Sequence, residues 1–377
     1  SAMSLGALAR HVLFIGGHGP FAVLTDPGRT SGEPLDEAGW AAGAILPEAV
    51  RPEDTAESLG AALYALADRV EAGLRTADPE ARKNVECITH GEDRDNWTVE
   101  GITSYYQWVS LLRAGVIDAN EFLGKLAKMI GALLRIPGRH ASTLEQSSFD
   151  AWIKAYQPHP NNRNADVSYY LKGALASFAL DVMIRVDTDG ARCLDDVLRH
   201  LWHHYAREQG YPEGGYEAIV EEVVGNEVSD FFDTFIRSTA DPDWDDWLEN
   251  IGLKLVAETQ PGALPYFGFD ADDAGKIRYV DADSPAERGL YPGDRVVAVD
   301  GHDAAGKLDD LLREATPDAP TRFHVFRRGI LVETTLTPAA PRPGKWRLCR
   351  RADADPQALA LLEQWLGSAD LPHSEEE

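Results

Sequence analysis

The chain has 377 residues, of which 44% are hydrophobic and 26% are charged, and its formal net charge is −26 at pH 7. This length allows two or three domains with a sizeable core, and the hydrophobic fraction excludes wholesale disorder. The acidic balance argues against nucleic acid or an anionic membrane surface as a partner, because either would repel the chain.

The cysteines and the lengths of the apolar runs indicate in which cellular compartment the protein is found. Cys87, Cys193 and Cys349 are widely separated and odd in number, which fits reduced thiols better than a disulfide framework. No apolar run is long enough to span a membrane, and no signal peptide opens the chain. Ser1 and Ala2 resemble a cloning remnant before Met3. We therefore expect a cytoplasmic protein.

The first hundred residues predict one strand pair and one helix. Residues 11–24 read as two short strands joined by a glycine-rich turn. Residues 26–54 are rich in Pro, Gly, Asp and Glu and predict a loop. Leucine and valine then recur at helical spacing over residues 55–74, on a helix whose polar face carries no histidine. A polar segment follows over residues 76–96.

From Glu100 onward the pattern is mostly helical for about 140 residues. Breaks at Gly, Pro or Asn divide it into seven amphipathic segments: 98–114, 118–134, 146–156, 166–187, 193–208, 214–224 and 228–237. The acidic and aromatic run 241–247 predicts a solvated connector with packed tryptophans. The chain up to about residue 245 is therefore expected to be mainly helical.

After Trp247 the pattern changes to short strands separated by Pro-Gly and Asp-Gly turns. The predicted strands are 254–258, 276–281, 295–299, 322–327 and 331–336. One helix is expected over residues 304–314, a proline-rich linker over 338–344, and a last amphipathic helix over 356–367 before an acidic tail.

Three groups of residues in the helical part could carry chemistry. Glu100 could be a helix-start charge, a core ion-pair partner or a metal ligand. His200 and His204 lie four residues apart, but no H-E-x-x-H motif exists in the chain, so they are either exposed histidines or a weak metal pair. Tyr169 and Tyr170 open a long helix, where they either stabilise an oxyanion or simply pack.

In the β-rich part, Tyr266, Phe267, Gly268 and Phe269 form an aromatic–glycine loop that leads into a strand. Such a loop exposes successive backbone N–H groups beside an apolar pocket. That arrangement captures a C-terminal carboxylate while the peptide adds to the sheet as an extra strand. The loop is therefore a candidate peptide-binding site.

Two sets of motifs resemble known families. The run D-S-P-A-E-R-G-L-Y-P-G-D-R-V-V-A-V-D-G over residues 283–301 resembles the signature of bacterial PDZ domains, with a resemblance over residues 252–338. Three segments ahead of it, E-G-I-T-S-Y-Y, S-S-F-D-A-W-I-K and V-S-Y-Y-L-K-G, begin at Glu100, Ser147 and Val167. Together these motifs resemble the glycyl aminopeptidase family of zinc metallopeptidases over about residues 10–367.

This resemblance implies a thermolysin-like domain in which Glu100 takes the position of the third zinc ligand. The two histidines and the base of that family would lie on the helix at 55–74, which instead carries L-Y-A-L-A-D-R at residues 63–69. One carboxylate without histidines cannot hold Zn²⁺ or lower the pKa of its water. The only nearby substitutes are His90, Glu92 and Asp93.

The sequence therefore predicts an α+β multidomain protein: a degenerate thermolysin-like domain (5–248), a PDZ domain (252–338), and a linker, C-terminal helix and acidic tail (339–377). The expected role is a non-peptidase accessory protein of a bacterial cytoplasm, without metal or cofactor, whose partner is a peptide or protein C-terminus at the PDZ domain or a small molecule in the vestigial cleft. The alternative is a metal-free enzyme of a specialised biosynthetic pathway. It would use Glu100 as acid/base, helped by Tyr169, Tyr170 and His90. An atypical metallopeptidase is the third possibility.

Overall fold

The computed structural model describes residues 94–156, 159, 161–205, 211, 214–367 and 371. The described residues belong to two compact units, one containing residues 106–118 and the other containing the rest. The predicted strand pair at 11–24, the predicted helix at 55–74 and the candidate residue His90 lie outside the described residues.

Helix α6 (Asn96–Arg113) supplies most of the described part of the smaller unit. Within that unit the Arg113 guanidinium lies over the Tyr106 ring, 5.8 Å from its centroid. The helix ends at Gly115, whose φ of +67° is a left-handed conformation that glycine adopts without strain. Its N–H and that of Val116 bond the carbonyls of Leu112 and Leu111, which is the usual way for a helix to close its C-terminus.

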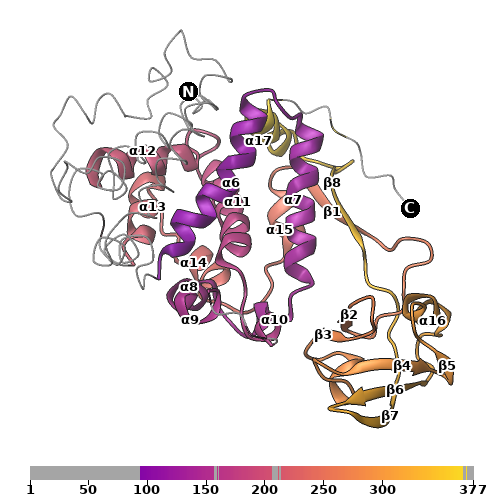
Figure 1. Cartoon of the computed structure of the whole chain (residues 1–377). Helices are drawn as coiled ribbons and strands as arrows, with labels where there is room; N and C mark the ends of the chain where they lie inside the picture. Colours follow the sequence, from indigo (N-terminus) through magenta and orange to yellow (C-terminus); the bar gives the residue numbers. More distant parts are fainter. Residues whose placement is uncertain are drawn as a thin grey trace, which may run out of the picture. The chain divides into compact units, whose positions relative to one another are not determined.

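The larger unit is helical over most of its first 150 residues (Figure 1). Its helices are α7 (Ala119–Leu134), η2 (Pro137–His140), α8 (Leu144–Phe149), α9 (Ala151–Lys154), α10 (Asn162–Ala165), α11 (Tyr169–Asp187), α12 (Leu194–Tyr205), α13 (Tyr216–Val224), α14 (Ser229–Phe235) and α15 (Trp244–Glu249). Several start at side-chain caps, because the first N–H groups of a helix need acceptors. Thr143 and Gln146 form a capping box on α8, and Ser168 caps α11.

Helix α11 is the centre of this helical part. Its residues from Lys172 to Arg185 are all buried. The segment 162–187 is long and apolar enough to cross a membrane, but 83% of its apolar window is buried inside the protein. A helix that is apolar on all sides and enclosed by protein is the ordinary core helix of a large domain.

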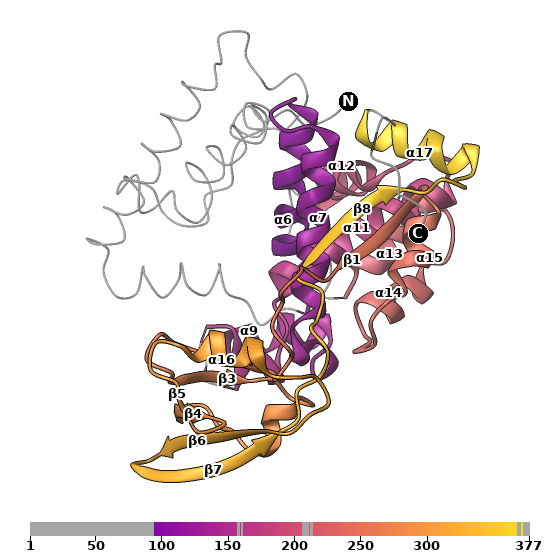
Figure 2. The same ribbon diagram turned by 90° about the vertical axis from the view of Figure 1, so that its right-hand side faces the viewer.

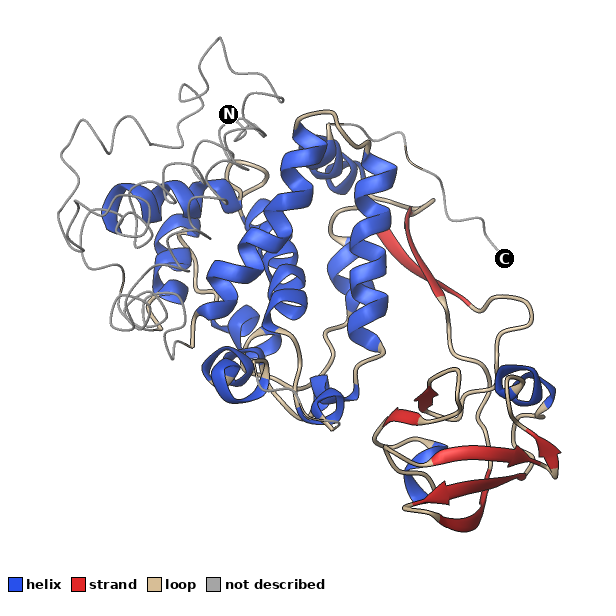
Figure 3. Ribbon diagram, viewed as in Figure 1, coloured by secondary structure: helices blue, strands red, loops and turns tan. Residues whose placement is uncertain are grey.

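The strands that the structure describes form three separate sheets, which Figure 3 shows in red. β2 (Phe269–Ala271) pairs with β3 (Ile277–Val280). β4 (Arg295–Val299), β5 (His302–Asp303), β6 (Thr321–Arg327) and β7 (Ile330–Leu336) form an antiparallel sheet in the order β5-β4-β6-β7. Helix α16 (Leu308–Glu314), the turn η3 (Pro285–Arg288) and these strands enclose one core, in which Phe267 and Phe323 meet edge to face.

The third sheet joins distant segments. β1 (Leu253–Glu258) pairs antiparallel with β8 (Lys345–Arg350), from Leu253 opposite Arg350 to Glu258 opposite Lys345. Figure 2 shows this pair beside α7. Gly131 makes this contact possible, because a Cβ there would lie 2.1 Å from the Trp346 ring. The last helix, α17 (Pro356–Leu366), starts at the cap Asp355 and packs Trp365 against Phe122 and Phe178.

Most predicted elements from residue 98 onward are confirmed within a few residues. The segment predicted as one helix over 146–156 is two short helices broken at Asp150. The predicted connector 241–247 is wrong in part, because Asp243 caps helix α15, whereas the predicted packing of its tryptophans is confirmed at Trp244, which is buried. The strand predicted at 254–258 belongs to the pair with β8, a strand that the sequence did not predict. The domain boundaries at 5–248, 252–338 and 339–377 stay predictions.

Two of the three cysteines can be placed. Cys193 is half-buried and Cys349 is buried, and both carry free thiols. Burial raises the pKa of Cys193 to about 11, so this thiol stays protonated and unreactive at neutral pH. Because Cys87 lies outside the described residues, the prediction of reduced thiols stays a prediction.

Candidate functional site

Glu100 lies where α6 crosses α11. Gly101 and Gly173 meet at this crossing so closely that a Cβ on Gly101 would lie 2.5 Å from the carbonyl carbon of Gly173. Because α6 begins at Asn96, Glu100 is in its second turn, and the reading of this residue as a helix-start charge is wrong. Its half-buried carboxylate makes no hydrogen bond or ion pair with the residues that the structure describes, so no ion-pair partner is found there either.

Tyr169 and Tyr170 begin α11, as the sequence predicts. Tyr169 is buried and its hydroxyl lies 3.2 Å from that of Tyr156, while Tyr170 is 39% exposed and its ring centroid lies 4.7 Å from that of Tyr169. Burial raises the pKa of both phenols well above the ordinary value, with further contributions from Tyr156 and, for Tyr170, from the charge of Glu100. Both hydroxyls are therefore neutral hydrogen-bond donors, and Glu100 acts on Tyr170 through its field.

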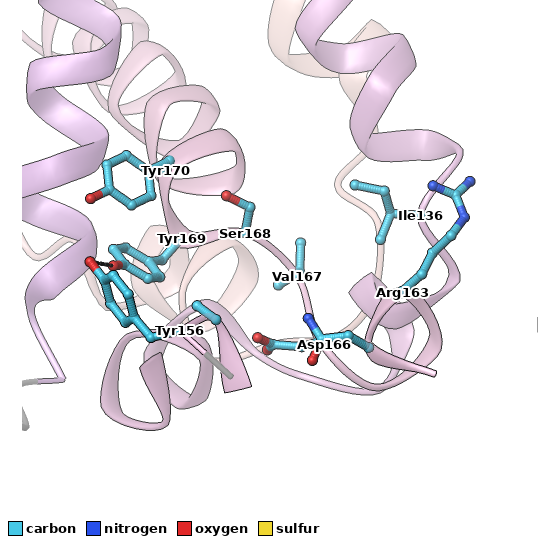
Figure 4. A pocket seen from close by; sticks show the side chains of 10 residues that line it. Ile136, Tyr156, Arg163, Asp166, Val167, Ser168, Tyr169 and Tyr170 are labelled. Atoms are coloured by element: carbon cyan, nitrogen blue, oxygen red, sulfur yellow. Dashed lines mark hydrogen bonds between the residues drawn. The ribbon is translucent and has the colours of Figure 1, made fainter. Parts of the chain in front are cut away.

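A pocket of about 540 Å³ opens beside these tyrosines. Its lining comes from the end of α9, from α10, from the start of α11 and from Ile136. Figure 4 shows Tyr156, Tyr169 and Tyr170 on one side and Ile136 and Arg163 on the other, with Asp166, Val167 and Ser168 between them. The lining residues are Ile136, Ala155, Tyr156, Asn162, Arg163, Asp166, Val167, Ser168, Tyr169 and Tyr170. The volume is within the range of small-molecule sites.

The polar lining contains one unusual group, the carboxyl of Asp166, which is only 5% exposed. Burial raises its pKa, and a hydrogen bond from Ser142 opposes the rise. Its Oδ1 has no hydrogen-bond partner among the described residues. A buried acceptor without a donor destabilises the native state, so such atoms are rare and often functional.

Arg163 is the one cationic side chain among the lining residues, and it is paired with residues outside the pocket. Its Nε donates to Asp281 Oδ1 at 2.8 Å, and its guanidinium also bonds the carbonyl of Arg135 and lies over the Tyr279 ring. Asp281 accepts a second hydrogen bond, from the hydroxyl of Tyr266 at 3.0 Å. The side chain therefore fixes the pocket wall and does not neutralise Asp166.

Phe267 and Gly268 in the loop Tyr266–Phe269 are both buried, and the role of this loop in peptide binding stays a prediction. Tyr266 exchanges two backbone hydrogen bonds of 2.9 Å with Ala339, and Gly268 has a φ of +83°. The carbonyls of Phe267 and Gly268 accept bonds from Ala286 and Asp281. Within the described part of the chain, the N–H groups of Phe267 and Gly268 donate to nothing. Two successive N–H groups without an acceptor, beside the strand β2, can donate hydrogen bonds to a carboxylate.

The residues present do not fit a zinc site of the H-E-x-x-H type. The chain has no such motif, and where the structure describes it, no three His, Cys, Asp or Glu side chains gather as metal ligands. On α12, His200 and His204 stack with ring centroids 4.2 Å apart, and His200 lies 3.4 Å from Glu222. His204 is exposed, which agrees with the reading of these residues as surface histidines.

Sequence reasoning brought Tyr169 and Tyr170 together but missed Tyr156 and Asp166. Tyr156 lies two residues beyond α9, after the break at Asp150 that was not predicted. Asp166 is buried because Gly138 lies against its backbone, where a Cβ would come within 2.1 Å of the Asp166 carbonyl oxygen. That contact joins segments about 28 residues apart. The local signal, an aspartate two residues before the helix cap Ser168, does not reveal it.

Comparisons with known proteins agree with this architecture. The family model of M61 glycyl aminopeptidases matches residues 75–176, which include Glu100, Tyr156, Asp166, Tyr169 and Tyr170. The crystal structure of an aminopeptidase N family protein from Idiomarina loihiensis superposes with a TM-score of 0.66 at 25% identity. The match covers 84% of this chain and 56% of that chain, so this chain spans less than two thirds of its neighbour. None of the curated proteins compared gives a match. Over residues 75–176 the chain is thus similar to the M61 glycyl aminopeptidases, and its fold is similar to that of an aminopeptidase N family protein.

Proposed function

We propose that this chain is a non-peptidase member of its family that binds the C-terminus of a peptide or protein at the loop Tyr266–Phe269. The observation that carries the proposal is the pair of free N–H groups on Phe267 and Gly268, since a carboxylate is the anion that two adjacent backbone donors bind most readily in peptide recognition.

The surroundings of the loop fit an extended peptide. β2 pairs only with β3 among the described strands, so one edge of β2 is open for a further strand. Phe269, Leu308 and Leu311 are partly buried against the same core and present apolar surface from β2 and from α16. A peptide strand added to β2 would satisfy its backbone and place alternate side chains against these residues.

Binding assays on the whole protein test this site. We expect peptides with a free C-terminal carboxylate to bind at least about tenfold more tightly than the same peptides with a C-terminal amide, a difference of about 1.4 kcal/mol. Gly268→Ala should abolish binding, because the new Cβ would lie 2.1 Å from Ser284 Cβ. Gly262→Ala is the matched control, with the same left-handed φ but no atom within 4 Å. Equal affinity for acid and amide would refute the proposal.

The loss of the family's chemistry is tested separately. The chain lacks H-E-x-x-H, so we expect no aminopeptidase turnover on glycyl substrates and no stoichiometric zinc in the purified protein. Metal analysis and a turnover assay, each repeated after incubation with zinc, measure this. Stoichiometric zinc together with turnover would establish the third possibility, an atypical metallopeptidase.

A second candidate function is a metal-free enzyme of a specialised biosynthetic pathway. The observation that favours it is the carboxylate of Glu100, which has no partner among the described residues and whose charge acts on the neutral phenol of Tyr170 at the edge of a pocket. Glu100 would be the acid/base, with Tyr169 and Tyr170 as donors and His90 as a further group. Loss of a pathway product in a Glu100→Gln strain would support this function. Biosynthetic genes on both sides of the coding sequence would favour it over the binding role.

We also propose a cytoplasmic location in a bacterium. The free thiols of Cys193 and Cys349 and the net charge of −26 support it. Fractionation of cells that express the protein, followed by detection with an antibody, tests the location.

A further inference from the structure

The pocket beside Tyr156 has properties that the proposed peptide-binding loop does not use. Two acceptor oxygens on its lining residues, Asp166 Oδ1 and Asn162 Oδ1, have no hydrogen-bond partner among the described residues. Two orphan acceptors in one pocket call for a ligand that donates hydrogen bonds, because each unpaired buried acceptor costs about 1–3 kcal/mol.

The charge around the pocket is negative. Asp166 and Glu100 form no ion pair with the described residues, although the charge of Lys154 lowers the pKa of Asp166, and the cations Lys154 and Arg163 are both paired. Lys154 Nζ lies 2.8 Å from Asp150, and Arg163 is bound to Asp281. Figure 4 shows the Arg163 guanidinium turned away from Asp166. A cationic ligand would therefore meet an uncompensated carboxyl, and its charge would relieve the burial that raises the pKa of Asp166.

The walls of the pocket suit the same ligand. Tyr156 and Tyr170 are 45% and 39% exposed, so parts of both rings are open to solvent. Aromatic faces attract ammonium groups through the ring quadrupole, with a contribution of about 0.5–2 kcal/mol. Ile136, Ala155 and Val167 add apolar lining that would cover a hydrocarbon body.

We infer that this pocket binds a molecule that carries a protonated amine on an apolar or aromatic body, with the ammonium on Asp166 and Asn162 and the body among the tyrosines. The site uses neither the backbone N–H groups of the loop Tyr266–Phe269 nor zinc chemistry. The same ammonium could come from a free small amine or from the N-terminus of a peptide.

Isothermal titration calorimetry on the whole protein tests the inference with phenethylamine, 2-phenylethanol and the tripeptide amide Gly-Phe-Ala-NH₂. We expect the amine to bind at least about tenfold more tightly than the isosteric alcohol. Tighter binding of phenethylamine than of the tripeptide identifies a small molecule as the source. The reverse order identifies a peptide N-terminus, and either order supports the site.

Asp166→Asn keeps the shape of the side chain and removes its charge, so it should weaken amine binding about tenfold or more without changing alcohol binding. Asp230→Asn, on an exposed residue of α14, is the matched control and should leave amine affinity unchanged. If Asp166→Asn fails to fold, Tyr156→Leu, at a half-exposed ring, should still weaken the amine about threefold or more. Equal binding of amine and alcohol to the wild type, or unchanged amine affinity in folded Asp166→Asn, overturns the inference.

Discussion

Gly101 of α6 lies directly against Gly173 of α11, with no room for a side chain at Gly101 and little at Gly173. Both glycines belong to motifs that resemble the family, one next to Glu100 and the other three residues after Tyr170. The close crossing brings the starts of the two motifs together, which is why the charge of Glu100 reaches the phenol of Tyr170. These glycines therefore position the site although neither can do chemistry.

Gly101→Ala should lower the free energy of unfolding by about 1–3 kcal/mol. The new methyl would meet the backbone of Gly173, which cannot rotate away, and this overpacking outweighs the gain of about 1 kcal/mol in helix propensity. Gly124→Ala, inside α7 with no atom within 4 Å, should raise the same quantity by up to about 1 kcal/mol. Urea denaturation measures both, and a shift of the same sign in the two variants would contradict the prediction.

The C-terminal helix is tied to α6 by a buried chain of hydrogen bonds. The Trp365 indole donates to the Tyr105 hydroxyl at 3.1 Å, and Tyr105 donates to Asp181 Oδ2 at 2.9 Å. Tyr105→Phe and Trp365→Phe should each cost about 1–3 kcal/mol. Because they share one chain, the double variant should cost less than the sum by about 0.5 kcal/mol or more. Strict additivity in urea denaturation would show that the two residues act separately.

Lys172 gives a pH dependence of stability. Burial lowers the pKa of this ammonium from 10.5 to about 8, although its Nζ donates to the Ser238 carbonyl. Between these two values the native state has lost the proton and the unfolded state still binds it. Stability therefore rises with pH over this range, by up to about 3 kcal/mol. Lys172→Met should lack this rise, and denaturation of both proteins at several pH values above neutral checks it. Parallel curves would contradict the lowered pKa.

Asp294 is part of the motif over residues 283–301, and its contacts explain why this position is an aspartate. Its buried carboxylate accepts from the Tyr291 N–H and from the Arg327 guanidinium at 2.7 Å. Asp294→Asn should cost about 2–4 kcal/mol, because it leaves a charged partner poorly satisfied. Asp270→Asn removes the exposed pair with Arg278 and should change stability by less than about 1 kcal/mol. Thermal unfolding of both variants measures the contrast, and equal losses would contradict it.

The sequence predicted those helices and strands whose caps, breaks and apolar spacing lie within or next to the element itself. Ser168, Thr143 and Asp355 are caps that stand immediately before their helices, and β4, β6 and β7 lie where strands were predicted, although the pairing of β4 with β6 shifts between Val296 and Ala298. β8 was missed because its residues are basic and follow a proline-rich run, and its partner β1 lies about 90 residues earlier. Asp166 was missed for the same kind of reason, since only the distant Gly138 explains its burial.

The pairing of β1 with β8 has a consequence for how the chain is assembled. The chain leaves the end of β1 and returns to the start of β8 at one point, where Glu258 faces Lys345. There the Gly344 N–H donates to the Glu258 carbonyl. In topological terms, residues 259–344 are an insertion at the tip of a β-hairpin. Replacing them with a two-residue Asn-Gly turn would close an ordinary hairpin. Removal of residues 259–344 would therefore leave β1 and β8 paired and the helical part of the chain uncut.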